Sequence, residues 1–101
     1  MKYVVIEVID HYPTGDIVRE IPFIFPASIV HSEMEMSIHR MLRRERADGR
    51  LRELNTVSAG FLSSFEFTGN CYGDSKSIGV GSRGMEDTLL IQSIDYTHGV
   101  K

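Results

Sequence analysis

Hydrophobic residues cluster in two N-terminal segments that are separated by a short polar stretch. Tyr3–Ile9 and Ile17–Phe25 are rich in Val, Ile and Phe, and the residues between them include Pro13 and Gly15. Apolar runs on either side of such a stretch predict a β-hairpin. Since Pro22 cannot donate a ladder hydrogen bond, the second strand is expected at a sheet edge or broken at this residue.

The hydrophobic period becomes helical after Pro26. Residues 27–47 carry one apolar stripe at helical spacing. Its members are Val30, Met34, Ile38 and Met41, with Leu42 at the border. Asp48 and Gly49 are expected to end this helix, because glycine readily takes the left-handed conformation at a helix C-terminus.

Two more strands and a second helix are predicted after the long helix. Leu54–Leu62 and Phe65–Tyr72 have the composition of strands, and in the second of them apolar and polar residues alternate. The intervening Ser63-Ser64 favours no tight turn, so one long bent strand with a bulge is an alternative to two strands. Met85, Leu89, Leu90 and Ile94 then recur at near-helical spacing over Met85–Ile94.

The order of these elements predicts an α+β fold in a single domain over residues 1–101. It would hold a mainly antiparallel sheet in β-β-α-β-β-α order, with one long helix packed on one face, a layout similar to β-grasp folds. We expect a single core between the sheet and the long helix. Its predicted members are Val4, Ile6, Val8, Phe23, Met34, Ile38, Met41, Phe65 and Phe67.

Composition narrows the classes of partner. Fourteen acidic against eleven basic residues give a formal net charge of −3, so the whole molecule is not expected to bind nucleic acid or an anionic membrane. The lone Cys71 can form no internal disulfide and favours a reducing compartment. The N-terminal apolar run is interrupted by Glu7, which predicts neither a signal peptide nor a membrane span, and hence a cytoplasmic protein.

The stretch Gly73–Asp87 gathers glycines, hydroxyls and two cations ahead of the second helix. Its G-x-G-x-x-G spacing is not expected to be a dinucleotide site, because too few residues follow it for the required helix, strand and acid. Backbone amides, hydroxyls and the Arg83 fork would suit a phosphate. The candidate anion ligands are Ser75, Lys76, Ser77, Gly79, Gly81, Ser82, Arg83 and Gly84. The alternative is that these are turn residues only.

A second candidate surface is the arginine-rich end of the long helix and the loop after it. Six of the eight arginines lie there together with His39. The candidate partner-binding residues are Arg40, Arg43, Arg44, Arg46 and Arg50, with Arg52 next to them. Cations are favoured at a helix C-terminus, so a solvated helix end is the alternative to a contact surface. Because aromatic side chains are not interleaved, an acidic protein surface is a better partner than single-stranded nucleic acid, and contact with the phosphates of a duplex is the other alternative.

Support for metal binding or catalysis is thin. His31, Glu35 and His39 recur every four residues on one helix flank, but a zinc site would need ligands from another element, so a polar flank is the better interpretation. Cys71 shares a strand face with phenylalanines, which predicts a buried, inert thiol. Asp95 and His98 lack a serine in nucleophile context, so we expect neither an enzyme nor a cofactor.

Several short segments resemble a loose set of small uncharacterised accessory proteins of tailed phages and prophages of Gram-negative bacteria. They are the N-terminal hairpin, Phe25-Pro26, Val57–Phe61, the Gly73–Gly79 loop with Ser82, Arg83 and Asp87, and the ending Asp95–Gly99. Residues 31–52 follow no pattern of that set.

The resemblance implies a phage-encoded binding protein that contacts and modulates or inhibits a host factor in the host cytoplasm. A phosphate- or nucleotide-binding sponge that uses Gly73–Gly84 is the alternative. An edge strand broken by Pro22 also leaves room for pairing with a second subunit.

Overall fold

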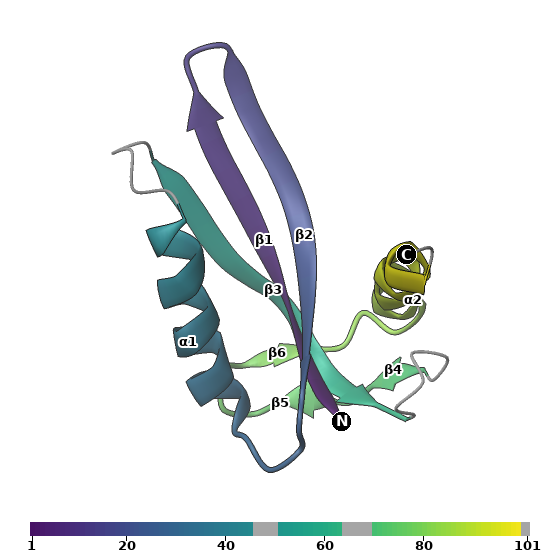
Figure 1. Cartoon of the computed structure of the whole chain (residues 1–101). Helices are drawn as coiled ribbons and strands as arrows, with labels where there is room; N and C mark the ends of the chain where they lie inside the picture. Colours follow the sequence, from purple (N-terminus) through teal and green to yellow (C-terminus); the bar gives the residue numbers. More distant parts are fainter. Residues whose placement is uncertain (46–50, 64–69, 100–101) are drawn as a thin grey trace.

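A long N-terminal β-hairpin forms the centre of the molecule in this computed structural model, which describes residues 1–45, 51–63 and 70–99. β1 (Lys2–Tyr12) and β2 (Gly15–Phe25) pair antiparallel throughout their length. The predicted hairpin is therefore confirmed, with longer strands and a shorter turn than the sequence indicated. Its tip stands clear of both helices in Figure 1.

The hairpin belongs to an antiparallel sheet with the strand order β2-β1-β3-β4. β3 (Arg52–Leu62) pairs with β1 along most of its length, and the short β4 (Cys71–Tyr72) pairs with the end of β3. β2 is an edge strand, as Pro22 predicted. β1 is central, and its run Tyr3–Ile6 is buried completely on both faces.

A β-bulge at Val57 lets Thr56 and Ser58 of β3 point to opposite faces of the sheet. Val5 is opposite Ser58 and Ile6 is opposite Thr56, so Val57 is the extra residue. Thr56 bonds to the first helix, whereas Ser58 bonds to the second. The bulge expected near Ser63-Ser64 falls partly on residues outside the described ranges, as does most of the predicted strand Phe65–Tyr72.

The long helix is α1 (His31–Arg44), which is shorter at its start than predicted. Ile38 and Leu42 are buried and Met34 is partly buried, but Met41 is 47% exposed. The prediction that Met41 lies in the core is wrong. The buried side of the helix is defined by His31, Ile38 and Leu42, and Met41 lies to one side of it. Val30 occupies the N-cap position, makes no side-chain capping hydrogen bond and is exposed. The predicted helix end at Asp48-Gly49 lies outside the described residues.

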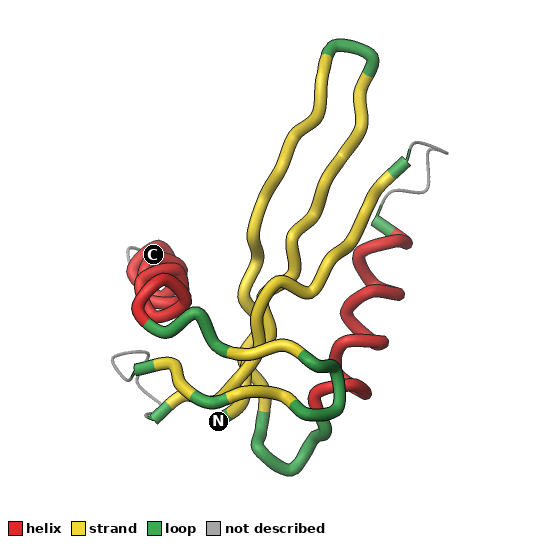
Figure 2. The backbone as a smooth tube through the Cα atoms, turned by 180° about the vertical axis from the view of Figure 1, so that it is seen from behind, coloured by secondary structure: helices red, strands yellow, loops and turns green. Residues whose placement is uncertain are grey.

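The C-terminal part of the chain begins on the α1 side of the sheet, where Ile78 and Val80 pack against the core that includes Ile38, and continues to a second helix on the other face. A small hairpin of β5 (Asp74–Ser75) and β6 (Val80–Gly81) lies against β3 and leads into α2 (Met85–Gly99). Figures 1 and 2 show α1 and α2 on opposite sides of the sheet. The chain is thus a small α+β domain with an antiparallel sheet and two helices, and the β5–β6 hairpin is an addition to the predicted order.

Each face of the sheet has its own apolar layer. The layer under α1 contains Val4, Ile6, Val8, Phe25, Ile38, Leu42 and Ala59, with Phe23 and Met34 packed against it. The layer under α2 contains Tyr3, Val5, Leu62, Cys71 and Ile91. The predicted single core is therefore divided in two, and its members Phe65 and Phe67 lie outside the described residues.

The inward face of α2 contains polar as well as apolar residues. Met85 and Leu89 are 65% and 58% exposed, whereas Asp87 and Thr88 are buried with Ile91. Of the apolar residues that recur at helical spacing, Leu90 packs against the core with Ile91.

Gly60 allows the second apolar layer to close. A Cβ atom at this position would lie 2.4 Å from the carbonyl oxygen of Tyr72 and 3.3 Å from the ring of Tyr3. Only glycine lets β4 approach β3 this closely.

Candidate functional site

The loop predicted to bind an anion is largely closed on itself. The Ser82 amide donates to the Gly73 carbonyl at 2.9 Å, and the Gly79 amide donates to the Ser75 carbonyl at 2.9 Å. Ser75 is buried, and its hydroxyl lies 3.3 Å from that of Ser77. These bonds build the β5–β6 hairpin, so those amides do not converge on an empty concavity.

Arg83 is held by two carboxylates of the chain itself. Its Nη1 and Nη2 each lie 3.0 Å from an oxygen of Glu20, and its Nε lies 2.8 Å from Oδ1 of Asp87. The hydrogen bonds to Glu20 are the main reason why the pKa of Arg83 is raised. The bidentate fork expected to hold a phosphate is thus used inside the protein.

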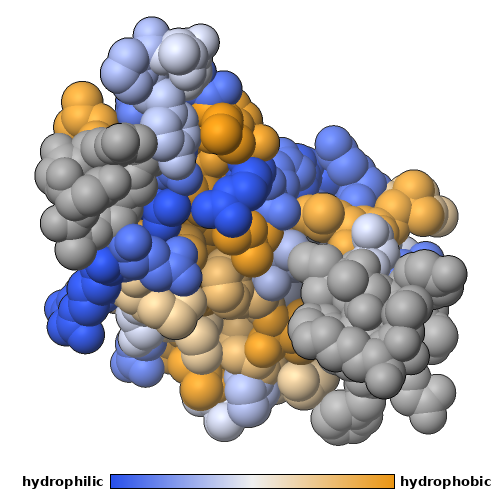
Figure 3. Space-filling model, turned by 45° about the horizontal axis from the view of Figure 1, so that its top comes forward, coloured by the Kyte–Doolittle hydropathy of each residue, from blue (hydrophilic) through white to orange (hydrophobic). Residues whose placement is uncertain are grey.

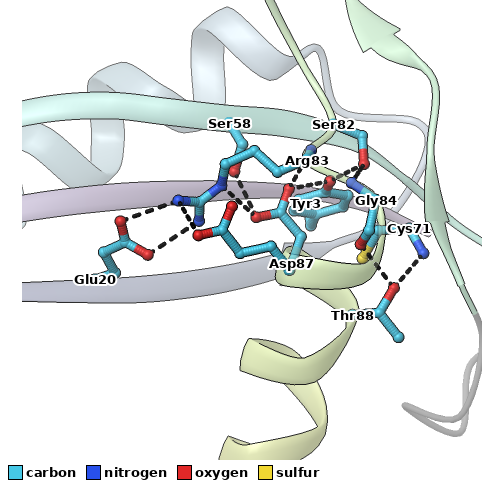
Figure 4. Close-up of polar contacts among 10 residues, drawn as sticks. Tyr3, Glu20, Ser58, Cys71, Ser82, Arg83, Gly84, Asp87 and Thr88 are labelled. Carbon is cyan, nitrogen blue, oxygen red and sulfur yellow. Dashed lines mark hydrogen bonds and ion pairs between the residues drawn. The ribbon is translucent and has the colours of Figure 1, made fainter.

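Asp87 is the centre of this arrangement (Figure 4). Its side chain is fully buried and accepts hydrogen bonds from the Tyr3 hydroxyl at 2.6 Å and the Ser58 hydroxyl at 2.9 Å. The Arg83 amide donates to it at 2.9 Å. Burial by itself raises the pKa of Asp87, but the hydrogen bonds from Tyr3, Arg83 and Ser58 outweigh burial and lower it.

Tyr3 links this carboxylate to the loop. Its hydroxyl also lies 2.7 Å from the Ser82 Oγ. Since a carboxylate can only accept, the single Tyr3 proton goes to Asp87, and the Ser82 hydroxyl donates to Tyr3. Burial and the bond to Asp87 raise the pKa of Tyr3.

We call Tyr3, Glu20, Ser58, Ser82, Arg83 and Asp87 the Asp87 cluster. The Gly84 amide donates to Ser82 Oγ at 2.9 Å, so a backbone N–H group just before α2 also finds its acceptor in the cluster. The carboxylate of Asp87 takes the place that a bound anion would have at this helix N-terminus. Of the remaining candidate ligands, Lys76, Gly79 and Gly81 are exposed.

The predicted partner surface divides into free and engaged arginines. Arg40, Arg43 and Arg44 are exposed on α1 and form no ion pair with any other described residue. Met36 is on the same outward side, at 54% exposure. Arg46 and Arg50 lie outside the described ranges. We call Met36, Arg40, Arg43 and Arg44 the arginine face.

Arg52 does not belong to that surface. Its Nε and Nη2 lie 2.6 and 2.9 Å from the two oxygens of the buried Asp10, and its Nη1 donates to the Leu42 carbonyl at 2.6 Å. The hydrogen bond to Asp10 raises the pKa of Arg52. Arg52 therefore joins β3 to β1 and to the end of α1.

On the face shown in Figure 3, hydrophobic and hydrophilic side chains are interspersed.

The polar flank of α1 is used for packing. His31 is buried between Phe25 and Phe61, and its Nε2 donates to the Gly60 carbonyl at 3.0 Å. Glu35 accepts a hydrogen bond from Thr56, whose hydroxyl also lies 3.4 Å from His39. Within the ranges that the structure describes, no three ligands gather at a metal-binding distance.

Cys71 is buried, as its strand position predicted. Burial raises the pKa of its thiol, which disfavours the nucleophilic thiolate. The side chains of Asp95 and His98 are not among those described.

The residues that sequence reasoning missed are Tyr3, Glu20 and Ser58. Tyr3 had one signal, since it is a polar-tipped side chain in a run otherwise dominated by Val and Ile. Glu20 had none, because it lies 63 residues from Arg83.

Comparisons of the chain with protein-family models, with curated proteins and with solved structures find no match. A search of the described helices finds none with the length and apolar character needed to cross a membrane.

Proposed function

We propose that this chain is an accessory binding protein that modulates a host factor, and that the arginine face is its contact surface. One observation carries the proposal. Arg52 and Arg83 are both committed to carboxylates of the chain, whereas Arg40, Arg43 and Arg44 are exposed with no ion pair to a described residue.

The chemistry of this face suits an acidic protein surface. Guanidinium groups bind carboxylates in a bidentate manner, and Met36, one helical turn before Arg40, adds an adaptable apolar contact. The whole chain carries a net charge of −3, so attraction to an acidic partner must come from this local excess of positive charge. Docking should therefore weaken as salt screens the arginines.

The phage-like segments support a partner in the cytoplasm of a bacterial host. One helix that crosses an antiparallel sheet is also the basis for the proposed similarity to β-grasp folds. The alternative function, a phosphate or nucleotide sponge, loses support because Glu20 and Asp87 already occupy Arg83.

Partner capture with charge-reversed variants tests the proposal. Tagged protein is used to purify a host partner from lysate, and the affinity of the purified partner is then measured by calorimetry at low and high salt. Arg43→Glu is compared with Lys76→Glu, which makes the same change of formal charge on the exposed β5–β6 loop, outside the arginine face.

We expect Arg43→Glu to weaken binding about tenfold, equivalent to about 1.4 kcal/mol, with a larger effect at low salt. Lys76→Glu should bind as the parent does. If both variants bind alike, or if salt has no effect, the arginines are only a solvated helix end.

A further inference from the structure

The outer edge of β2 is open for pairing. β2 is the terminal strand of the four-stranded sheet, and no described strand lies beyond it. All residues of Gly15–Arg19 are exposed, and Ile17 and Val18 are 53% and 57% exposed. This half of the hairpin extends past both helices (Figures 1 and 2), so neither helix covers it.

The register shows which backbone groups face outward. The His11 amide donates to the Leu51 carbonyl at 3.2 Å, so the odd-numbered residues of β1 direct their hydrogen bonds toward β3. These residues are opposite the even-numbered residues of β2, for example His11 opposite Asp16. Asp16 and Val18 therefore present their amide and carbonyl groups at the open edge.

The lower half of the same edge is protected. Pro22 also has an outward-facing position, where it offers no N–H group. Glu20 is tied to Arg83 at the start of α2. Proline and fixed charges are common means by which edge strands avoid pairing. Here both protecting residues, Glu20 and Pro22, follow Arg19 in the sequence. The segment Gly15–Arg19 is therefore a short, unprotected edge.

We propose that this segment pairs antiparallel with the same segment of a second copy, forming a two-fold dimer with Ile17 facing Ile17 across the axis. Two identical edges satisfy each other around such an axis. In this register, Asp16 of each copy forms a hydrogen-bonded pair with Val18 of the other. The exposed isoleucines meet at the closely spaced, non-hydrogen-bonded position.

Charge selects this register over its neighbours. With Val18 at the axis, Asp16 would lie opposite Glu20 of the other copy. With Asp16 or Arg19 at the axis, each would face its own like charge. Among the registers centred on residues 16 to 19, the Ile17-centred one alone avoids direct like-charge pairs, and it also keeps Pro22 outside the paired region.

The dimer should be weak. Five residues of strand span about 17 Å. A contact of this length should bury much less surface than the roughly 800 Å² per partner of a stable interface. We therefore expect a monomer–dimer equilibrium that depends on concentration, with a dissociation constant between about 10 µM and 1 mM.

Sedimentation equilibrium over that concentration range tests the inference. Val18→Pro removes one outward amide and no internal ladder bond, so it should reduce association at least tenfold while the protein stays folded by circular dichroism. Val18→Thr keeps the amide and serves as the control, with association within about threefold of the parent. A parent protein that is monomeric up to about 1 mM overturns the proposal.

Charge swaps at Ile17 test the register. Ile17→Lys and Ile17→Glu should each abolish the homodimer, and an equal mixture of the two variants should dimerise again. In the Val18-centred register, Ile17 lies opposite Arg19, so Ile17→Glu alone would strengthen the dimer and overturn the Ile17-centred pairing. A dimer insensitive to changes at both positions would place the interface elsewhere and likewise overturn the proposal.

Discussion

Replacing Tyr3 with phenylalanine removes one hydroxyl from the Asp87 cluster and leaves the ring in the apolar layer. The lost hydrogen bond joins that hydroxyl to a fully buried carboxylate at 2.6 Å. Hydrogen bonds to charged groups contribute about 1.5–3 kcal/mol. The Ser82 hydroxyl also loses its acceptor, although it still accepts from the Gly84 amide. We therefore expect the free energy of unfolding to fall by about 2–3 kcal/mol.

Urea unfolding followed by circular dichroism measures this change. Tyr72→Phe is the matched control, because Tyr72 is 54% exposed and its stacking on Phe61 is kept. The control should change stability by less than about 0.5 kcal/mol. For a domain of this size, a loss of 2 kcal/mol lowers Tm by about 8–16 °C.

The pH dependence gives a second, independent reading of the same cluster. The pKa of Asp87 is lowered in the folded state, so its contribution is present above the ordinary carboxyl pKa of 3.8 and is lost as the pH falls further. The pKa of Tyr3 is raised, so its contribution is lost above the ordinary phenol pKa of 10.0. Tyr3→Phe should flatten the alkaline decline. If Tyr3→Phe costs no more than Tyr72→Phe and leaves that decline unchanged, the cluster does not stabilise the fold.

Three further outcomes follow from other contacts. Gly60→Ala should destabilise by more than about 3 kcal/mol in chemical unfolding, since its Cβ would lie 2.4 Å from a backbone oxygen, whereas Gly81→Ala, with its nearest atom at 3.6 Å, should be tolerated. Arg52→Ala should cost about 3–5 kcal/mol by leaving Asp10 buried without its main partner, and adding Asp10→Ala should recover part of that loss; strict additivity would refute the pairing. Asp16 and Glu53 raise the pKa of His11 by hydrogen bonding to its ring, so its contribution is present below the ordinary pKa of 6.5 and disappears as the pH rises through the folded value. The stability difference between the parent and His11→Gln should therefore be larger at about pH 5.5 than at about pH 8.5, and an unchanged difference would contradict this assignment.

The hairpin could be predicted from the sequence because its signals are local. Two apolar runs flank a Pro- and Gly-containing stretch, and Pro22 marked the edge without reference to any other strand. The faces of the helices were harder. Both buried faces include polar residues, His31 on α1 and Asp87 with Thr88 on α2, and a hydrophobic pattern assigns such residues to solvent. Met41 was therefore placed inward.

The candidate site depended on pairings that no spacing reveals. Ser82 and Arg83 were singled out for their chemistry, and the structure does place both in a polar cluster. Their partners Glu20 and Tyr3 come from the first hairpin, far away in sequence. A carboxylate of the chain and a phosphate ligand demand the same donors. For this reason, composition alone could not distinguish an anion site from an internal ion pair.

The central position of β1 has a consequence for synthesis. β1 leaves the ribosome before the elements that cover it, and only β2 follows at once to pair with it. Before α1, β3 and α2 have been made, the run Tyr3–Ile6, which is wholly buried in the finished fold, exposes one edge and both faces of a β-branched, aggregation-prone strand. The nascent chain should therefore depend on chaperones, and slowing translation between β2 and β3 should divert it into inclusion bodies.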